Sequence, residues 1–253
     1  MTIRERRSSI TEHLRNYGFV RNSELSNRFG VSIVTIRQDI DALYAQGLVQ
    51  KTYGGAVLTA DASLDSSFAA RSSERADAKR RIGAAAAKTI RPGQVILLDS
   101  GSTTFEIARS LPENSEITVV TCGLNIALEA GKKSGVTVIL CGGRLNPRTL
   151  STVDHQTERQ LAEIRADWLF LATYGVDLER GLAERTYEVA QTKRTLIGAA
   201  REVTLVCDSS KFGSAGPVLI SALSVVSKII TDAAIPDDYR AWFESHDIEV
   251  QIA

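Results

Sequence analysis

Short apolar runs alternate with amphipathic segments from about residue 81 onward, and this alternation restricts the fold more than any other feature of the sequence. The apolar runs read QVILLD, ITVVT, VTVILC, DWLFLA, VTLVCD and KIITD, and they have the length of β-strands. Segments such as STTFEIARSL, LNIALEAGKK and YEVAQTKRTLIGAA lie between them and favour helices. Strands that alternate with helices form βαβ units, so we expect an α/β domain around a mostly parallel sheet.

The first part of the chain has a different pattern, made of three short helical segments and a glycine-tipped hairpin. The second helical segment is expected to begin after an N-cap at Ser23 and to stop at Gly30. In the third, Ile36, Ile40 and Leu43 recur at i, i+4 and i+7, which places them on one helix face. The runs LVQKTY and AVL then flank a glycine pair that suits a tight turn. This order predicts a helix-turn-helix, to which the hairpin adds a wing.

These patterns divide the chain into three parts. We expect the winged helix-turn-helix in residues 1–57 and the α/β domain in residues 76–253. Residues 58–75 between them are small and polar. The first half of this segment is typical of a linker, and the second half of the start of a helix.

The charge of the chain is balanced overall but not along its length. The 253 residues carry 30 basic and 30 acidic side chains, whereas residues 1–57 carry eight basic and five acidic ones. The resulting charge of +3 suits a polyanionic partner, although many solvated surfaces have a similar charge. No apolar run is long enough to cross a membrane, and the N-terminus lacks the apolar core of a secretion signal. We therefore expect a cytoplasmic protein.

The cysteines and histidines form neither a disulfide framework nor a metal-binding pattern. Cys122, Cys141 and Cys207 are far apart, and each lies in or beside an apolar run, so we expect buried thiols. The three histidines have no ligand spacing. We therefore predict no metal site and no cofactor.

The third helical segment carries side chains suited to reading DNA. Helix-turn-helix proteins place the N-terminal part of this helix in the major groove. Arginine can bind guanine in a bidentate manner, glutamine can bind adenine, and threonine can contact a phosphate or a thymine methyl group. Asp39 is expected to orient an arginine or to cap the helix locally. The alternative is a small packing module with a solvated polar face. Ser32 is also a candidate for the N-cap of this helix. The predicted DNA contacts are Ser32, Val34, Thr35, Arg37, Gln38, Lys51 and Tyr53.

A strand followed by small hydroxyl residues indicates a phosphate site in the second domain. In LLDSGSTTFEIARSL the apolar strand ends at Asp99, and the residues from Ser100 to Thr104 lead into a helix. Small side chains leave room for an anion, and the free N–H groups at the helix start favour it. The alternative is that these hydroxyls are simple N-caps.

Four other polar, glycine-bearing loops follow apolar strands: TCGLN, CGGRL, TYGVD and CDSSKFG. Open parallel sheets bind ligands beyond the carboxyl ends of their strands, so we expect the five loops to form one small-molecule site. For Lys193 the alternative is a solvated helix face. The predicted ligand-binding residues are Asp99, Ser100, Gly101, Ser102, Thr103, Thr104, Thr121, Cys122, Gly123, Gly142, Gly143, Tyr174, Asp177, Lys193 and Lys211.

The run VSIVTIRQDIDALYAQGLVQKTYGGAV closely resembles the DNA-binding signature of the DeoR family of bacterial sugar-operon regulators. That signature has the form VS..TIRRDL..L...GL..R.HGGA, and the shared positions include Thr35, Ile36 and Arg37. The chain differs at Gln38, where the family usually has a second arginine, and at Tyr53, where histidine is common. These differences bear on the operator sequence more than on the DNA-binding role.

Residues 68–253 resemble the sensor domain of the same family, which is similar in fold to ribose-5-phosphate isomerase. DSGSTT resembles its phosphate-cradling loop, and CDSSKFG resembles its DSSKF loop. The isomerase needs paired aspartates and a lysine in a glycine-rich turn. Here Tyr174 replaces the first aspartate, only Asp177 remains, and ERGLAERT stands in place of the lysine turn, so catalysis is not expected. Cys122 stands where the family commonly has asparagine.

The resemblance implies a DNA-binding transcriptional repressor of a catabolic operon for a sugar or sugar derivative. Its partners would be double-stranded operator DNA and a phosphorylated effector, such as a sugar, amino-sugar or polyol phosphate. A homo-oligomer, dimer or tetramer, is expected because two DNA half-sites match a two-fold protein. Two alternatives stay open: a sugar-phosphate isomerase-like enzyme, and a constitutive DNA-binding protein without an effector.

Overall fold

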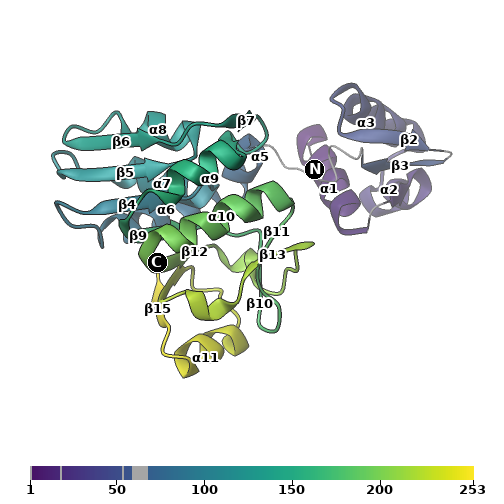
Figure 1. Ribbon diagram of the computed structural model, residues 1–253. Helices are drawn as coiled ribbons and strands as arrows, with labels where there is room; N and C mark the ends of the chain where they lie inside the picture. The colour runs from purple at the N-terminus through teal and green to yellow at the C-terminus, as the bar shows by residue number, and fades with distance from the viewer. Residues whose placement is uncertain (1, 18, 53, 59–67) are drawn as a thin grey trace. The chain divides into compact units, whose positions relative to one another are not determined.

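The computed structural model describes residues 2–17, 19–52, 54–58 and 68–253. The chain divides into two compact units, Met1–Ser66 and Ser67–Ala253, which we call the head and the sensor unit. In Figure 1 the head runs from purple to dark blue, and the sensor unit runs from the blue of α5 through teal and green to yellow.

The head contains three helices and a small antiparallel sheet (Figure 1). The helices are α1 (Ile3–Tyr17), α2 (Asn22–Phe29) and α3 (Ile33–Ala45). A hairpin of β2 (Val49–Thr52) and β3 (Gly55–Leu58) follows them. The predicted winged helix-turn-helix is therefore confirmed.

A third strand, which the sequence analysis did not predict, completes the sheet of the head. β1 (Phe19–Arg21) pairs with β3, so that β3 lies in the middle of the order β1-β3-β2. β1 leads directly into α2, and the N–H of Asn22 donates to the carbonyl of Gly54 at 2.9 Å. The predicted N-cap at Ser23 is wrong, because the last residue of β1 already occupies the N-cap position. The predicted stop at Gly30 is confirmed by its left-handed φ of 63°.

Apolar side chains from every element of the head meet in one core. Ile36, Ile40 and Leu43 of α3 are buried, as predicted from their spacing. Their partners from the other helices and the strands are Ile10, Leu14, Val20, Leu25, Val49 and Ala56. Burial of each large apolar side chain contributes about 1.5–3 kcal/mol, so this packing holds the opposite, polar face of α3 outward.

The sensor unit is built on a seven-stranded sheet in which all neighbouring strands are parallel. The strand order is β15-β14-β12-β9-β4-β5-β6, from the bottom to the top of Figure 1. All six predicted strands are present: β4 (Val95–Leu98), β5 (Ile117–Thr121), β6 (Val136–Leu140), β9 (Ala166–Leu171), β12 (Ala200–Val206) and β14 (Lys228–Thr231). The edge strand β15 (Glu249–Ile252) was not predicted, because its EVQI pattern lacks the continuous apolar run of a buried strand.

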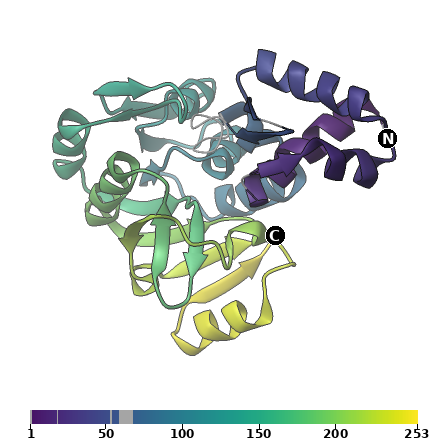
Figure 2. The same cartoon turned by 90° about the vertical axis from the view of Figure 1, so that its right-hand side faces the viewer.

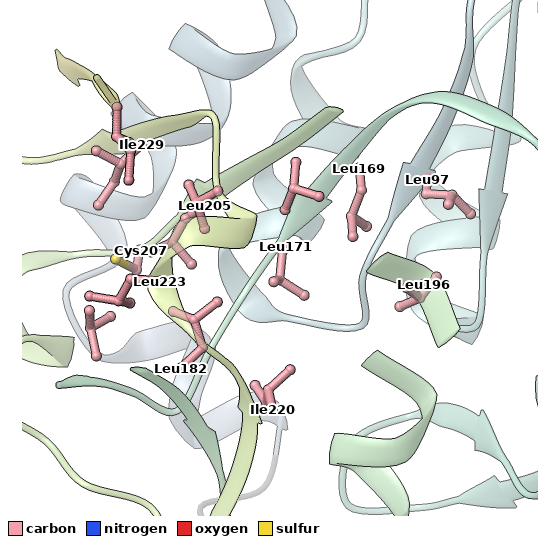
Figure 3. Packing of buried hydrophobic residues seen from close by; sticks show 14 of the residues in the cluster. Leu97, Leu169, Leu171, Leu182, Leu196, Leu205, Cys207, Ile220, Leu223 and Ile229 are labelled. Atoms are coloured by element: carbon pink, nitrogen blue, oxygen red, sulfur yellow. The ribbon is translucent and has the colours of Figure 1, made fainter. Parts of the chain in front are cut away.

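Helices cover both faces of this sheet. One face packs against α6 (Ala76–Ala87), α7 (Ser102–Ser110) and α8 (Leu124–Ala130). The other packs against α9 (His155–Ala162), α10 (Tyr187–Ala199) and α11 (Asp237–Ser245). Figure 2 shows α11 and β15 in yellow at the edge of the sensor unit. Figure 3 shows leucines from four elements in the second core: Leu97 of β4, Leu169 of β9, Leu205 of β12 and Leu196 of α10.

Two small antiparallel sheets extend from the loops of the sensor unit. One is formed by β7 (Arg144–Asn146) and β8 (Ser151–Val153), and the other by β10 (Gly175–Asp177), β11 (Gly181–Glu184) and β13 (Val218–Ser221). Short 3₁₀ turns follow β12 and β13, at Ser209–Lys211 and Leu223–Val225. The sequence analysis did not predict these strands, because three or four residues give too few repeats for a periodic pattern.

A short helix, α5 (Phe68–Ser73), lies within the range expected to be a linker. The ring of Phe68 packs edge-on against the ring of Phe105 in α7, with centroids 5.4 Å apart. At the other end of α5, the buried ammonium of Lys79 donates to two carbonyls, those of Arg71 at 2.5 Å and Glu74 at 2.7 Å. The chain is therefore held to the sensor unit from Phe68 onward. Residues 59–67 of the expected linker lie outside the described residues.

Candidate functional site

The N-terminal part of α3 presents the side chains predicted to contact DNA. Arg37 and Gln38 are exposed, Thr35 is half-buried, and Val34 is 62% exposed. Because the apolar stripe of α3 holds the opposite face against the core, these side chains remain available to a partner. Ser32 is the N-cap, as predicted, and its Oγ accepts the N–H of Thr35 at 3.1 Å.

Asp39 links α3 to α1 through two arginines. Its carboxylate is buried, with Oδ2 at 2.5 Å from Nε of Arg6 and Oδ1 at 2.9 Å from Nε of Arg7. The expectation that Asp39 orients an arginine is confirmed. Sequence reasoning did not identify Arg6 and Arg7, because they lie in the first helix and no spacing rule connects them to Asp39. The ion pairs set the rotation of α3 on α1, and with it the direction of the exposed face.

Lys51 of the wing is engaged within the head. Its Nζ lies 2.5 Å from Oδ1 of Asp41 and 4.8 Å from the centroid of the Tyr44 ring. An ion pair between exposed side chains contributes only about 0–1 kcal/mol, so a DNA phosphate can compete with Asp41 for this ammonium. Tyr53, the last of the predicted DNA contacts, lies outside the described residues.

The loops after β4 and β9 meet at the point where the strand order of the sensor sheet reverses. From β4 the chain winds outward through β5 and β6, and from β9 it winds in the other direction through β12, β14 and β15. Open α/β sheets bind ligands in the crevice at such a switch point, beyond the carboxyl ends of the strands. The predicted residues from Asp99 to Thr104 follow β4, and Tyr174 follows β9.

A buried ion cluster lies at this switch point. Nζ of Lys193 lies 2.9 Å from Oδ2 of Asp99 and 2.8 Å from Oε1 of Glu184, and it donates to the carbonyl of Ala172 at 2.7 Å. Lys193 is 4% exposed, so the alternative of a solvated helix face is wrong. An ammonium has three donors, and here each has an acceptor. A ligand could therefore bind Lys193 only by displacing one of these groups.

The charge of Lys193 is supported by its two acidic neighbours. Burial disfavours the ammonium, but the carboxylates of Asp99 and Glu184 outweigh this effect and raise the pKa of Lys193 above its ordinary value of 10.5. The cluster sets two carboxylates against one ammonium, so its formal charge is −1. Sequence reasoning missed Glu184, because only the chain path through β11 brings it to Asp99.

Two hydroxyls at the start of α7 make no hydrogen bond within the described part of the chain. Oγ1 of Thr104 accepts the N–H of Gly101 at 2.8 Å and also donates to the carbonyl of Asp99. Gly101 is the N-cap of α7 and Thr104 is the third residue of the helix, so the alternative of simple N-caps describes none of these hydroxyls. Ser102 and Thr103 stand at the start of α7, and their hydroxyls have no recorded hydrogen bond within the described part of the chain. Ser102 is 9% exposed and Thr103 is 5% exposed, so both side chains are buried. Their hydroxyls are candidates to bind a ligand.

Close approach of the two loops depends on Gly101. A Cβ at this position would lie 2.5 Å from Cβ of Ala172, which is shorter than any normal carbon–carbon contact. The N–H of Ala172 also donates to Oδ2 of Asp99 at 3.0 Å. The loop after β9 is therefore fastened directly to the loop after β4.

The loops after β5 and β6 are closed by their own hydrogen bonds. Oγ1 of Thr121 donates to the last carbonyl of β4 at 2.6 Å and accepts the N–H of Gly123 at 3.0 Å. The N–H of Gly142 donates to a glutamine of α9 at 2.9 Å. Gly143 has a φ of 143°, and a Cβ there would lie 2.1 Å from a threonine hydroxyl of α9. The prediction of buried thiols is confirmed for Cys122, Cys141 and Cys207.

Two other predicted residues flank the switch point. Oδ1 of Asp177 accepts the N–H groups of Glu179 at 3.0 Å and Arg180 at 2.7 Å, and so closes the turn between β10 and β11. Lys211 is half-buried in the 3₁₀ turn after β12, the strand next to β9. The structure thus brings the β4 loop, Tyr174 and Lys193 together and places the other predicted residues to either side.

Within residues 2–17, 19–52, 54–58 and 68–253, no group of three or more His, Cys, Asp or Glu side chains is placed to hold a metal ion. None of the helices described there is long and apolar enough to cross a membrane.

Comparisons with known proteins assign both units to one family. Residues 6–61 match the DeoR-like helix-turn-helix domain, and residues 74–233 match the DeoR C terminal sensor domain. A protein of Escherichia coli O157:H7 whose name refers to repression of the aga operon is 35% identical over 97% of this chain and 92% of its own length. The glycerol-3-phosphate regulon repressor of Escherichia coli K12 is 32% identical over 98% of each chain. A solved ribose 5-phosphate isomerase A from Methanocaldococcus jannaschii is 17% identical over 54% of each chain, with a TM-score of 0.40.

A winged helix-turn-helix joined to an α/β sensor domain defines a DNA-binding transcription regulator rather than an enzyme. The chain belongs to the DeoR family of transcriptional repressors. The resemblance found in the sequence is confirmed. The alternative of an isomerase-like enzyme is wrong, because both units match a family of transcriptional repressors.

Two replacements of Arg37 test whether this side chain binds a base or a phosphate of the DNA. If Arg37 binds a guanine, Arg37→Ala should weaken binding to the preferred duplex by about 1–3 kcal/mol and relax the preference at one position. Arg37→Lys keeps the charge but loses the bidentate geometry, so it should lose nearly as much. Fluorescence anisotropy with a duplex selected from random DNA measures both variants. Full affinity in Arg37→Lys would instead assign Arg37 to the DNA backbone.

Proposed function

We propose that the chain represses a catabolic operon for a sugar or sugar derivative, and that a phosphorylated form of that compound controls its affinity for the operator. Two relatives named for the aga operon and the glycerol-3-phosphate regulon support a carbohydrate-related target. The head supplies the DNA contacts through Ser32, Val34, Thr35, Arg37, Gln38, Lys51 and Tyr53. A homo-oligomer, dimer or tetramer, presents two heads to two half-sites.

The observation that carries the effector proposal is the position of the free hydroxyls of Ser102 and Thr103. They stand at the start of α7, beyond the carboxyl end of β4, where the winding of the sheet reverses. The N–H groups of a helix start favour an anion. A phosphate bound there would receive hydrogen bonds from both hydroxyls and from the loop backbone, while the rest of the effector lies toward the loops after β5, β9 and β12.

Control of DNA binding follows from linkage between the two sites. We assume two conformations, of which one spaces the heads correctly for the operator and the other does not. If the effector binds the second conformation more tightly, it weakens DNA binding, and the loss in binding free energy equals the coupling free energy between the two sites. A coupling of about 1–3 kcal/mol corresponds to roughly 5- to 150-fold in operator affinity. α5 is suited to transmit this change, because Phe68 packs on Phe105 of α7, the helix whose first residues are Ser102 and Thr103.

Removal of the two hydroxyls is expected to abolish the response to the effector while operator binding persists. Ser102→Ala with Thr103→Val deletes both without adding volume. A hydrogen bond to a charged group contributes about 1.5–3 kcal/mol, so the affinity for an active phosphorylated compound should fall at least about 10-fold. Thermal shifts and operator release are measured with galactosamine 6-phosphate, glucosamine 6-phosphate and glycerol 3-phosphate, each beside its unphosphorylated counterpart.

A matched control tests whether the hydroxyls themselves matter. Ser110→Ala removes a hydroxyl from the last residue of α7 and should respond as the wild type does. If the double variant still releases the operator at wild-type effector concentrations, the phosphate binds elsewhere. If no compound of this class shifts the wild-type protein, the effector is not a sugar phosphate, and a constitutive DNA-binding protein becomes the better description.

A further inference from the structure

The side chains of Arg185 and Tyr174 form a stacked pair at the switch point. The guanidinium carbon of Arg185 lies 4.4 Å from the centroid of the Tyr174 ring, within the range of a cation–π interaction. Both side chains are half-buried. The N–H of Tyr174 donates to the carbonyl of Ala183 at 3.1 Å, which ties the loop after β9 to the end of β11. This backbone hydrogen bond holds together the two segments that carry the pair.

This pair stands next to the loop proposed to bind phosphate. Tyr174 lies two residues after Ala172, which is hydrogen-bonded to Asp99 and packs against Gly101. Arg185 directly follows Glu184, and its N–H donates to Oε2 of Glu184 at 3.1 Å. The backbone segments that carry Tyr174 and Arg185 are thus tied to Asp99 and Glu184, two members of the buried ion cluster.

The charges at the switch point leave a phosphate without a counter-charge unless a further cation takes part. The buried cluster of Asp99, Glu184 and Lys193 has a formal charge of −1, and all three donors of Lys193 are already used. Hydroxyls and amides carry no net charge. A phosphate dianion placed beside this cluster would therefore be repelled by it.

Arg185 is suited to supply the missing charge. Arg144 is paired with Glu188 at 2.6 Å, and Arg75 donates to Ser209 at 3.0 Å. For the guanidinium of Arg185, by contrast, the Tyr174 ring is the one partner recorded among the described residues. A guanidinium stacked by its face keeps the donors at its edge free, and these match two oxygens of a phosphate.

We propose that Arg185, oriented by the ring of Tyr174, is the cation that binds the phosphate of the effector. This inference rests on the proposed function, because that proposal places the effector site at the switch point. It adds that the site recognises the phosphomonoester group of the effector. Tyr174 acts as a positioning residue through its ring. Its hydroxyl has no part in this role.

The test uses inorganic phosphate as the probe, so that it does not depend on the effector. Thermal unfolding of the full-length protein is followed by tryptophan fluorescence, because Trp168 and Trp242 both lie in the sensor unit. Phosphate is compared with chloride at equal ionic strength. Wild-type protein should be stabilised by phosphate, and Arg185→Gln should bind it about 10- to 100-fold more weakly, as expected for lost hydrogen bonds between charged groups.

Further variants separate positioning from simple charge. Tyr174→Phe keeps the ring and should bind phosphate as the wild type does, whereas Tyr174→Leu should bind it more weakly. Arg185→Lys keeps the charge without the planar fork and should fall between the wild type and Arg185→Gln. Arg180→Gln removes an exposed arginine from the β10–β11 turn of the same small sheet and should have no effect.

The outcomes distinguish this inference from the proposed function. Equal stabilisation of wild type and Arg185→Gln by phosphate, or no stabilisation of the wild type, overturns the role of Arg185. If phosphate binding depends on Arg185 but no sugar phosphate releases the operator, the inference stands and the proposed effector class is wrong. Loss of binding in Tyr174→Phe would contradict the role given to the ring.

Discussion

Replacement of Asp39 by alanine is expected to unfold the head and to abolish operator binding, while the sensor unit stays folded. The carboxylate of Asp39 is held between Arg6 and Arg7, and the side chain of Arg6 is only 9% exposed. The variant leaves the guanidinium of Arg6 buried without its partner. Breaking a buried ion pair in this way costs about 3–5 kcal/mol, which is a large share of the stability of a unit of this size.

The two units can be followed separately in this experiment. Tryptophan fluorescence reports only the sensor unit, because both tryptophans lie there, whereas circular dichroism reports the helices of both units. Asp39→Ala should lower the helical signal at moderate temperature with little change in the tryptophan transition. Asp41→Ala, which removes an exposed partner of Lys51 from the same helix, should change stability by no more than about 1 kcal/mol. A stably folded, DNA-binding Asp39→Ala variant would show that the Asp39 ion pairs are dispensable.

Replacement of Lys193 by methionine should destabilise the sensor unit by a similar amount. The change leaves the carboxylates of Asp99 and Glu184 facing each other without the ammonium between them. We expect the free energy of unfolding to fall by about 3–5 kcal/mol, measured from the tryptophan transition in urea. Lys132→Met removes an exposed lysine paired with Glu129 and should cost no more than about 1 kcal/mol.

A neutralised variant keeps this prediction separate from a simple packing defect. Adding Asp99→Asn and Glu184→Gln to Lys193→Met removes the two unpaired charges and should recover part of the lost stability. A triple variant less stable than Lys193→Met would show that the loss does not arise from the unpaired carboxylates.

The pH dependence of the Lys193 contribution has a definite direction. The pKa of Lys193 is raised in the folded protein, so the folded state holds its proton more tightly than the unfolded state does. The contribution is therefore complete below the ordinary value of 10.5 and is lost as the pH rises through the higher folded value. The stability difference between wild type and Lys193→Met should stay constant from about pH 7 to 9 and shrink in more alkaline solution. A difference that shrinks between about pH 7 and 9 would contradict the raised pKa.

The parts of the fold that could be predicted are those with long and regular patterns. The apolar runs of the parallel sheet identified six strands, since a strand buried on both faces needs a continuous apolar run. The stripe of Ile36, Ile40 and Leu43 identified the buried face of α3 and, by exclusion, its open face. The short strands β1, β7, β8, β10, β11 and β13 could not be found in this way, because their pairing depends on partners elsewhere in the chain.

The candidate site likewise has a part that the sequence predicted and a part that it did not. The loop of residues 100–104 was visible in the sequence because a strand, a run of small residues and a helix follow one another directly. The partners of its neighbouring charges were not visible. Lys193 could equally have belonged to a solvated face, and neither Glu184 nor Arg185 has a spacing that connects it to Asp99.

By itself, the amino-acid sequence determined the two units, the parallel sheet, the polar face of α3 and the loops that end the strands. These features follow from the order of neighbouring residues, because helix and strand periodicity act over a few residues at a time. The tertiary structure alone decided that Asp39 pairs with α1, that Lys193 is buried between two carboxylates and that Arg185 stacks on Tyr174. Each of these contacts joins residues of different elements, so it depends on how those elements pack rather than on any local pattern.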